Sequence, residues 1–170
     1  GPGGSCWMPW YWHWTDPLGG AEYDPTRGGD VWWMSAPGGT MRDLHDTTNA
    51  PRYTQSMCGD FAVQTDVALA RTGSYQSAGL LVWKDAANFL RWEVNDSGAL
   101  RALRMRGGAW TDSDNLTYVP GNVRLHVQRV GQRIDCFAYV SGAWRHYRSW
   151  DLTNSAVEVG LFVVNVGPAT

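Results

Sequence analysis

The chain has 170 residues, of which 44% are hydrophobic and 18% charged, and its formal net charge is −2. This length suits a single domain that buries its own core. The lack of a basic surplus argues against a nucleic-acid partner, and the lack of any apolar run near the roughly 20 residues of a membrane helix argues against a membrane partner. Eleven tryptophans and twenty glycines stand out, and they favour short strands and turns with flat aromatic surface to spare.

The first residues, GPGGS, are typical of the remnant that a protease leaves when it removes an expression tag. We therefore expect residues 1–5 to be a remnant or linker and residues 6–170 to form one domain. A leader removed in this way leaves no trace, so this segment carries no information on secretion.

The stretch WYWHW, within a strand predicted at about 8–14, is aromatic throughout. Alternation along a strand places Trp10, Trp12 and Trp14 on one face and Tyr11 and His13 on the other. Both faces are then aromatic, so one set is expected either to be covered by a second layer or to form a binding surface.

Strand signals recur along the whole chain at the spacing of an all-β sandwich, whereas no window of a dozen residues keeps a helical period. Residues 61–69 and 123–128 alternate between apolar and polar side chains, which puts one face in a core and the other in water. Two such sheets packed face to face form an antiparallel β-sandwich. The strands are predicted at about 8–14, 31–35, 53–57, 60–70, 76–84, 88–95, 99–105, 122–130, 133–140, 144–150 and 156–165.

A long polar segment, SAPGGTMRDLHDTTNAPRY, separates two of the predicted strands. Loops of this length in a compact domain are often functional. The segment carries Asp43, His45, Asn49 and Arg52, whose side chains can hydrogen-bond sugar hydroxyls. These four residues are therefore candidates for ligand binding.

The excess of tryptophan has two interpretations. Any single tryptophan is best placed in a core, because its ring buries a large area. A core that holds all eleven is a poor expectation, and an exposed tryptophan offers a flat face on which a sugar ring stacks. Trp110, which follows two glycines, is expected in a loop and Trp144 in a structural role. The candidate ligand-binding residues are Tyr11, His13, Trp33, Asp43, His45, Asn49, Arg52, Gln76, Trp83, Arg91, Glu93 and Trp110.

Three cysteines allow at most one disulfide. Cys136 lies in an alternating segment and is predicted to be a buried free thiol, whereas Cys6 and Cys58 are a possible pair. No cysteine or histidine spacing supports a zinc site, and no cofactor is expected. The oxygen-rich segments TDSDN and HDTTN are possible calcium ligands, although each is more typical of a plain polar loop.

Several segments in order along the chain, WTDPLGG, APGGTMRDLHDTTNAPR, GDFAVQTDV, SAGLLVWKDAANFLRWE and VRLHVQRVGQRIDCFAYVSGAW, resemble a bacterial family of concanavalin A-like domains. That family is related to a yeast domain named for regulation of enolase, and the chain is also similar to the C-terminal sandwich domain of bacterial β-xylosidases. The likeness runs from about Trp10 to Asn165. It implies a two-sheet jelly-roll sandwich, secretion by a bacterium and a role in carbohydrate handling, with function inferred by analogy of fold.

Catalysis is the first alternative. Glucanases of this fold carry alternating carboxylates on one strand, and the nearest match, RWEVNDSG, has Glu93 without a second carboxylate at that spacing. A pair from distant strands, such as Glu93 with Asp66 or Glu158, stays open, as does a polysaccharide lyase that uses His126. No nucleophile elbow or phosphate loop is present.

The leading hypothesis is a non-catalytic carbohydrate-binding module, accessory to a larger secreted enzyme, that binds a plant or microbial polysaccharide of the xylan or β-glucan type. Trp stacking and polar contacts would supply the recognition. A glycosidase or lyase is one alternative. A protein-interaction domain that packs on an attached catalytic domain is the other, because an exposed aromatic patch fits it equally well.

Overall fold

A computed structural model describes residues 11–24 and 33–167. Within these ranges the chain forms strands and loops and no helix, so no helix there could cross a membrane. The strands are β1 (Trp12–Thr15), β2 (Glu22–Asp24), β3 (Trp33–Ser35), β4 (Arg52–Met57), β5 (Phe61–Val67), β6 (Gln76–Asp85), β7 (Asn88–Asn95), β8 (Ala99–Arg106), β9 (Ala109–Asp112), β10 (Thr117–Tyr118), β11 (Val123–Val130), β12 (Arg133–Val140), β13 (Ala143–Asp151) and β14 (Val157–Asn165).

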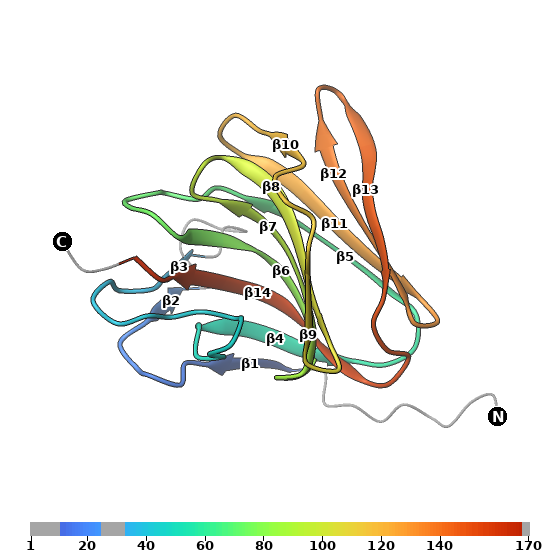
Figure 1. Cartoon of the computed structure of the whole chain (residues 1–170), viewed down its shortest axis with the longest axis horizontal. Helices are drawn as coiled ribbons and strands as arrows, with labels where there is room; N and C mark the ends of the chain where they lie inside the picture. Colours follow the sequence, from blue (N-terminus) through green and yellow to red (C-terminus); the bar gives the residue numbers. More distant parts are fainter. Residues whose placement is uncertain (1–10, 25–32, 168–170) are drawn as a thin grey trace.

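The predicted all-β sandwich is confirmed. The large sheet has the order β1-β4-β14-β6-β7-β8-β10, with β9 paired to β8, and the small sheet has the order β13-β12-β11-β5. All of these pairs are antiparallel. Figure 1 shows the two sheets facing each other, while β2 and β3 form a separate hairpin. The C-terminal strand β14 lies between β4 and β6, so the two ends of the fold are joined in one sheet.

Three short strands of the structure were not predicted from the sequence. β2, β9 and β10 have four residues or fewer, too few to show a period of two. Trp110 was expected in a loop, and that expectation is wrong: it lies in β9, opposite Met105 of β8. The two glycines before it, Gly107 and Gly108, make the hairpin turn with positive φ angles of 58° and 79°.

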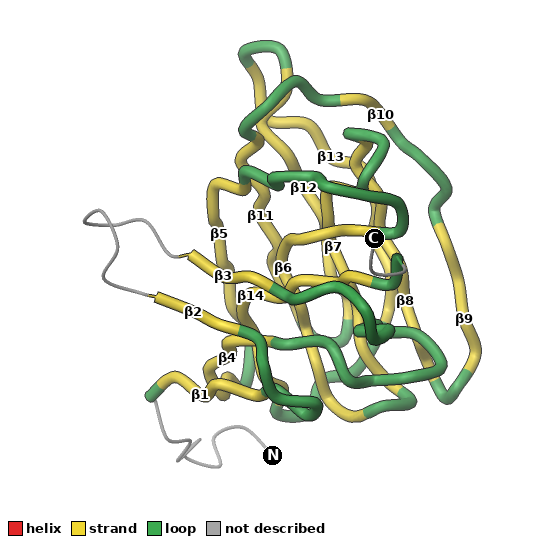
Figure 2. The backbone as a smooth tube through the Cα atoms, turned by 90° about the vertical axis from the view of Figure 1, so that its left-hand side faces the viewer, coloured by secondary structure: helices red, strands yellow, loops and turns green. Residues whose placement is uncertain are grey.

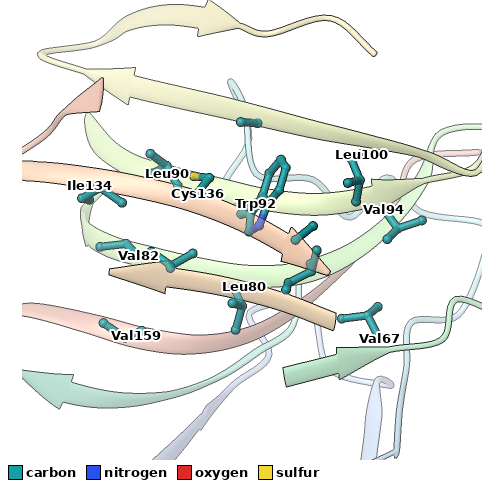
Figure 3. Packing of buried hydrophobic residues seen from close by; sticks show 14 of the residues in the cluster. Val67, Leu80, Val82, Leu90, Trp92, Val94, Leu100, Ile134, Cys136 and Val159 are labelled. Carbon is teal, nitrogen blue, oxygen red and sulfur yellow. The ribbon is translucent and has the colours of Figure 1, made fainter. Parts of the chain in front are cut away.

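The main core lies between the sheets and is built from alternate residues of each strand (Figure 3). On β7, Leu90, Trp92 and Val94 are buried in this core. The indole Nε1 of Trp92 donates to the Phe137 carbonyl oxygen of the small sheet at 2.8 Å, so its one polar atom is satisfied. Cys136 also lies here as a free buried thiol, as predicted.

A second, smaller core covers the other face of the large sheet. The loop between β3 and β4 passes over this face (Figure 2) and buries Leu44 and Ala50 against Leu81, Phe89 and Phe162, which extend outward from the sheet. The central strands are thus covered on both faces, which explains why β6 and β7 carry so many buried residues. This face, called the outer face below, is the one that carries the candidate site.

The disulfide hypothesis is tested in part. Cys58 is in a disulfide, whereas Cys6 lies outside the described residues. Burial raises the pKa of the free Cys136 thiol, which makes it an inert core residue.

Candidate functional site

A cavity of about 150 Å³ lies on the outer face, between the β3–β4 loop and the loop that precedes β6. Its floor is formed by β6, β7 and β8, and its walls by the two loops and β9. The residues that line it include three carboxylates and two guanidinium groups beside aromatic rings. It therefore combines a fixed floor with polar and flat apolar walls.

The floor holds a buried ion pair. Arg91 and Glu93 are two residues apart on β7, so they extend on the same face, and they are 4% and 1% exposed. Arg91 Nε lies 2.8 Å from Glu93 Oε1, and Arg91 Nη2 donates to Glu93 Oε2 at 3.2 Å. The guanidinium also donates to the Leu44 carbonyl oxygen at 2.8 Å and to Ser77 Oγ at 3.1 Å. Three hydrogen bonds from Nη1 and Nη2, together with the ion pair, thus hold the guanidinium of Arg91 within the protein.

The β3–β4 loop supplies one wall. Asp43 Oδ1 lies 3.6 Å from Arg91 Nη1, so the buried ion pair holds a carboxylate that is itself partly exposed. Asn49 closes the loop: its Oδ1 accepts from the Asp43 backbone N–H at 2.9 Å and its Nδ2 donates to the Met41 carbonyl oxygen at 3.0 Å. Asn49 therefore positions Asp43 rather than lining the pocket.

The loop is also anchored at its start. Arg42 Nη1 and Nη2 donate to the carbonyl oxygens of Pro37 and Gly19, each at 2.9 Å. Backbone hydrogen bonds join Arg42 to Asn165 of β14 in both directions at 2.9 Å. A loop fixed at this many points presents a preformed wall.

An aromatic row forms the neighbouring wall. Trp110 of β9 meets the ring of His45 edge-on, with 3.9 Å between ring centroids, and lies 6.3 Å from Phe89. Phe89 in turn stacks on Trp83 at 5.1 Å. The guanidinium of Arg52 also lies over the Trp83 ring, 4.4 Å from its centroid. Trp83 therefore contacts both Phe89 and Arg52, and Trp110 is the tryptophan of this row that lines the pocket.

Burial acts on Arg52 beside this row. It lowers the pKa of the Arg52 guanidinium, and the charge of Glu158 partly offsets that effect. The group stays a cation, since arginine is not deprotonated in proteins. Its position against Trp83 and away from the cavity makes it a support of the aromatic row.

The opposite wall comes from the loop before β6. Tyr75 lines the cavity there and is 70% exposed. Gln76 braces this loop: its Oε1 accepts from the backbone N–H groups of Thr72 and Gly73, at 2.8 and 3.1 Å. Its Nε2 donates to Thr72 Oγ1 and to Asn165 Oδ1. The amide group of Gln76 thus holds this loop in place.

The far end of the cavity is polar. Arg101 of β8 lines it and forms a bidentate ion pair with Asp112 of β9, at 3.1 and 2.6 Å. Asn95 Nδ2 donates to Asn115 Oδ1 at 2.7 Å, while Asp96 completes the lining. Both guanidiniums of the pocket, Arg91 and Arg101, are therefore already matched by carboxylates.

Six of the residues proposed from sequence line this cavity, and six do not. Asp43, His45, Gln76, Arg91, Glu93 and Trp110 line it. Asn49, Arg52 and Trp83 lie close by and support it, as described above.

Tyr11, His13 and Trp33 lie elsewhere. Tyr11 and His13 contact each other, with 4.6 Å between ring centroids, at the β1 edge of the large sheet. Trp33 lines a wider, more open hollow of about 640 Å³ together with Trp14 and Tyr23. We place the site in the smaller cavity because only there does a buried, hydrogen-bonded charge cluster lie beneath the opening.

Sequence reasoning missed Tyr75, Ser77, Asn95, Asp96 and Arg101 as lining residues. Ser77 and Asn95 alternate with core residues on β6 and β7, so their face was readable from the pattern. Tyr75 sits in a loop without periodicity, and no local signal marked it.

The distant catalytic pairs suggested by the sequence are not assembled. Asp66 and His126 extend from the outer side of the small sheet, where Asp66 pairs with Arg124 at 2.7 Å and His126 Nδ1 lies 3.3 Å from Gln64 Oε1. Glu93 faces away from both across the core. The pair of Glu93 with Asp66 is therefore not assembled.

Glu158 fails on distance. It lies on the outer face, four residues along β14 from Phe162, and Phe162 is two strands away from Glu93. These steps correspond to roughly 16 Å, whereas a glycosidase pair needs about 5–10 Å.

Two of the possible calcium ligands, Asp112 and Asn115, are engaged by protein groups. Asp112 is held by Arg101, and Asn115 accepts from Asn95. In the described part of the chain no group of three or more His, Cys, Asp or Glu side chains is arranged to hold a metal ion.

Solved structures share this sandwich at low sequence identity. The GH43 protein BlXynB from Bacillus licheniformis matches with a TM-score of 0.69 and 16% identity over 87% of this chain and 32% of its own. A xylan beta-1,4-xylosidase from Bacillus halodurans matches with a TM-score of 0.66 and 12% identity over 85% and 31%. The carbohydrate binding module CBM66 from Bacillus subtilis matches with a TM-score of 0.58 and 17% identity over 90% of both chains.

These likenesses establish the β-sandwich fold. This chain spans about a third of the length of the two Bacillus enzymes and most of the length of the binding module. No protein-family model and no curated protein matches the sequence.

Proposed function

We propose that this domain is a non-catalytic carbohydrate-binding module that holds one uncharged sugar ring in the cavity on the outer face. The observation that carries the proposal is the juxtaposition of Trp110 with the partly exposed carboxylate of Asp43 over a fixed ionic floor. An indole face suits the C–H side of a sugar ring, and a carboxylate accepts hydrogen bonds from its hydroxyls.

The size of the cavity favours a single ring. Its volume is about 150 Å³, and an engineered protein cavity of about that volume holds one benzene molecule. A cavity of this size, closed on one side by Asp43 and on another by Tyr75, suits the end of a glycan chain better than its interior.

The charges favour a neutral glycan. The carboxylates of Asp43, Glu93 and Asp96 outnumber the guanidiniums of Arg91 and Arg101, and both guanidiniums are paired. A uronic acid would bring a further negative charge without a free cation to receive it. Neutral polymers of the xylan or β-glucan type therefore fit better than pectin or alginate.

A binding role also agrees with the arrangement of carboxylates. Asp43 and Glu93 both lie against Arg91, whose guanidinium is held between them and the Leu44 carbonyl oxygen. A glycosidase needs one carboxyl group to donate a proton and another to act as a base or nucleophile, with the sugar between them. Here a guanidinium occupies that place.

The wider setting proposed is an accessory domain of a secreted bacterial enzyme that acts on glycans. Support comes from the two Bacillus enzymes, in which a similar sandwich accounts for about a third of the chain. The carbohydrate binding module CBM66 shares the sandwich over most of its length, which agrees with the binding role.

Affinity electrophoresis tests the proposal. The domain is run through gels that contain xylan, arabinoxylan, β-glucan, cellulose, mannan, pectin or alginate, and the same polymers are assayed for released products. Retardation by a neutral polymer without products supports a binding module, whereas products would make the protein an enzyme. Trp110→Ala should abolish retardation, and Trp144→Ala, on the small sheet, is the matched control.

A protein-contact role has one observation in its favour. Tyr139 and Trp144, in contact on the outer side of the small sheet, are both 43% exposed. If no polymer retards the domain, and Trp144→Ala disrupts its association with an attached catalytic domain, this second function replaces the first.

A further inference from the structure

Tyr75 has the least favourable backbone conformation of any bulky residue in the described ranges. Its φ angle is +56°, and the other non-glycine residues there with positive φ are Asp114 and Ser141, which are small polar turn residues. For a bulky residue this region of φ is a strained outlier that is found mainly at functional sites.

The surrounding structure imposes this conformation. Gln76 fixes the preceding turn through Thr72 and Gly73, and the Tyr75 carbonyl oxygen accepts from the Val166 backbone N–H at 3.0 Å. Gly167 packs so close to Ser74 that a Cβ there would lie 2.6 Å from the Ser74 carbonyl oxygen. The loop is therefore held in place by β14 and the segment that follows it.

Burial of the Tyr75 side chain does not offset this backbone strain. Tyr75 is 70% exposed, so its ring is not part of either core. A strained backbone that displays an unburied aromatic ring at the mouth of a cavity is explained by a ligand and not by packing.

We infer that Tyr75 is a specificity-determining residue that stacks on the second sugar unit of the ligand, the one that follows the ring in the cavity. This inference rests on the proposed function. The cavity accepts one ring, so a longer glycan must leave it at the open rim, and Tyr75 is the exposed aromatic ring on that rim. The chain is thus expected to recognise a terminal disaccharide rather than a monosaccharide.

Calorimetric titration tests the inference with two series, xylose to xylotriose and glucose to cellotriose. In the wild-type protein the disaccharide of the better series should bind about three- to ten-fold more tightly than the monosaccharide, with no further gain for the trisaccharide. Tyr75→Ala should remove this gain, so that the disaccharide binds no more tightly than the monosaccharide to the same variant, whereas Tyr75→Phe should keep it. Tyr139→Ala, an exposed tyrosine on the small sheet, is the matched control.

A stability measurement separates a ligand contact from a structural role. Tyr75→Gly removes the unfavourable φ, so its melting temperature should equal or exceed that of the wild type while the disaccharide gain disappears. A lower melting temperature would assign Tyr75 to folding instead. A disaccharide gain that survives Tyr75→Ala overturns the inference alone, and absence of binding by every sugar of both series overturns it together with the proposed neutral ligand.

Discussion

Arg91 and Glu93 form a buried ion pair, with 2.8 Å between Nε and Oε1, on the same face of the large sheet as the smaller apolar core. Charges this deeply buried are tolerated only when they are paired and hydrogen-bonded, and the pair adds little to stability compared with apolar residues of similar volume. The ion pair instead positions the pocket wall, because Arg91 also contacts the Asp43 carboxylate there.

Variants of the ion pair can distinguish its effect on stability from its effect on binding. Glu93→Gln leaves the buried guanidinium with only the longer contact to Asp43, so the free energy of unfolding should fall by about 3 kcal/mol and binding should be lost. The double variant Arg91→Met with Glu93→Leu should recover near wild-type stability and still fail to bind, because Asp43 has lost its partner. Urea unfolding and affinity electrophoresis measure the two effects, and retained binding by the double variant would contradict this role.

The β3–β4 loop offers a variant that touches neither the cavity nor a core. Asn49→Ala removes the hydrogen bonds to the Asp43 N–H and the Met41 carbonyl oxygen. We expect unfolding free energy to fall by about 1–2 kcal/mol and sugar affinity to fall at least as strongly, since Asp43 and His45 lose their fixed positions. Asn49→Asp keeps the acceptor and should bind better than Asn49→Ala in titration calorimetry. If both variants bind sugar as tightly as the wild type, the Asn49 hydrogen bonds are not needed to position the loop.

Gly79 of β6 is required by its neighbour strand. A Cβ at this position would collide with the Trp92 carbonyl oxygen of β7, so no side chain fits without moving a central strand. Gly79→Ala should lower the free energy of unfolding by at least about 2 kcal/mol. Gly73→Ala is the control: its nearest neighbour would be the flexible Gln76 side chain at 3.6 Å, so its effect in urea unfolding should be small. Similar losses from both variants would refute the steric argument.

Asp135 of β12 gives the fold a dependence on pH. Burial by itself raises the pKa of its carboxyl group, but hydrogen bonds from Ser149 and His146 and the guanidinium of Arg133 lower the pKa overall. A carboxylate with a depressed pKa stabilises the fold above its unfolded value of about 3.9, and this contribution is lost as the pH falls through the folded pKa. Asp135→Asn should therefore be less stable than the wild type near neutral pH, with the difference shrinking below about pH 4. Urea unfolding of both proteins across this range checks it, and a constant difference would disprove the assignment.

Much of the fold was readable from local pattern. The alternation of Val123, Leu125 and Val127 placed these residues in the core, where they are buried. The same rule placed Arg91 and Glu93 on one face of β7. Periodicity succeeds for strands with one face in the main core, because every second side chain is then buried and apolar.

The site was only partly readable because it depends on which strands are neighbours. Asp66 and Glu93 both lie on clearly alternating strands, yet their strands belong to different sheets and their side chains point away from each other. Sheet membership is set by long-range pairing, which a local pattern does not encode. The backbone angle of Tyr75 was equally invisible, since it is imposed by Gln76 and β14 rather than by the preference of tyrosine.

Because the large sheet is covered on both faces, alternate residues of one strand are under different constraints. On β7, the inward residues Leu90 and Trp92 pack between the two sheets, whereas the outward residues Arg91 and Glu93 line the cavity. Substitutions at outward positions that line the cavity can therefore change its lining while the inward set stays constant. A library at Ser77, Asn95, Arg101 and Tyr75 would vary the lining of the cavity without replacing the second core, Gly79 or the Arg91–Glu93 pair.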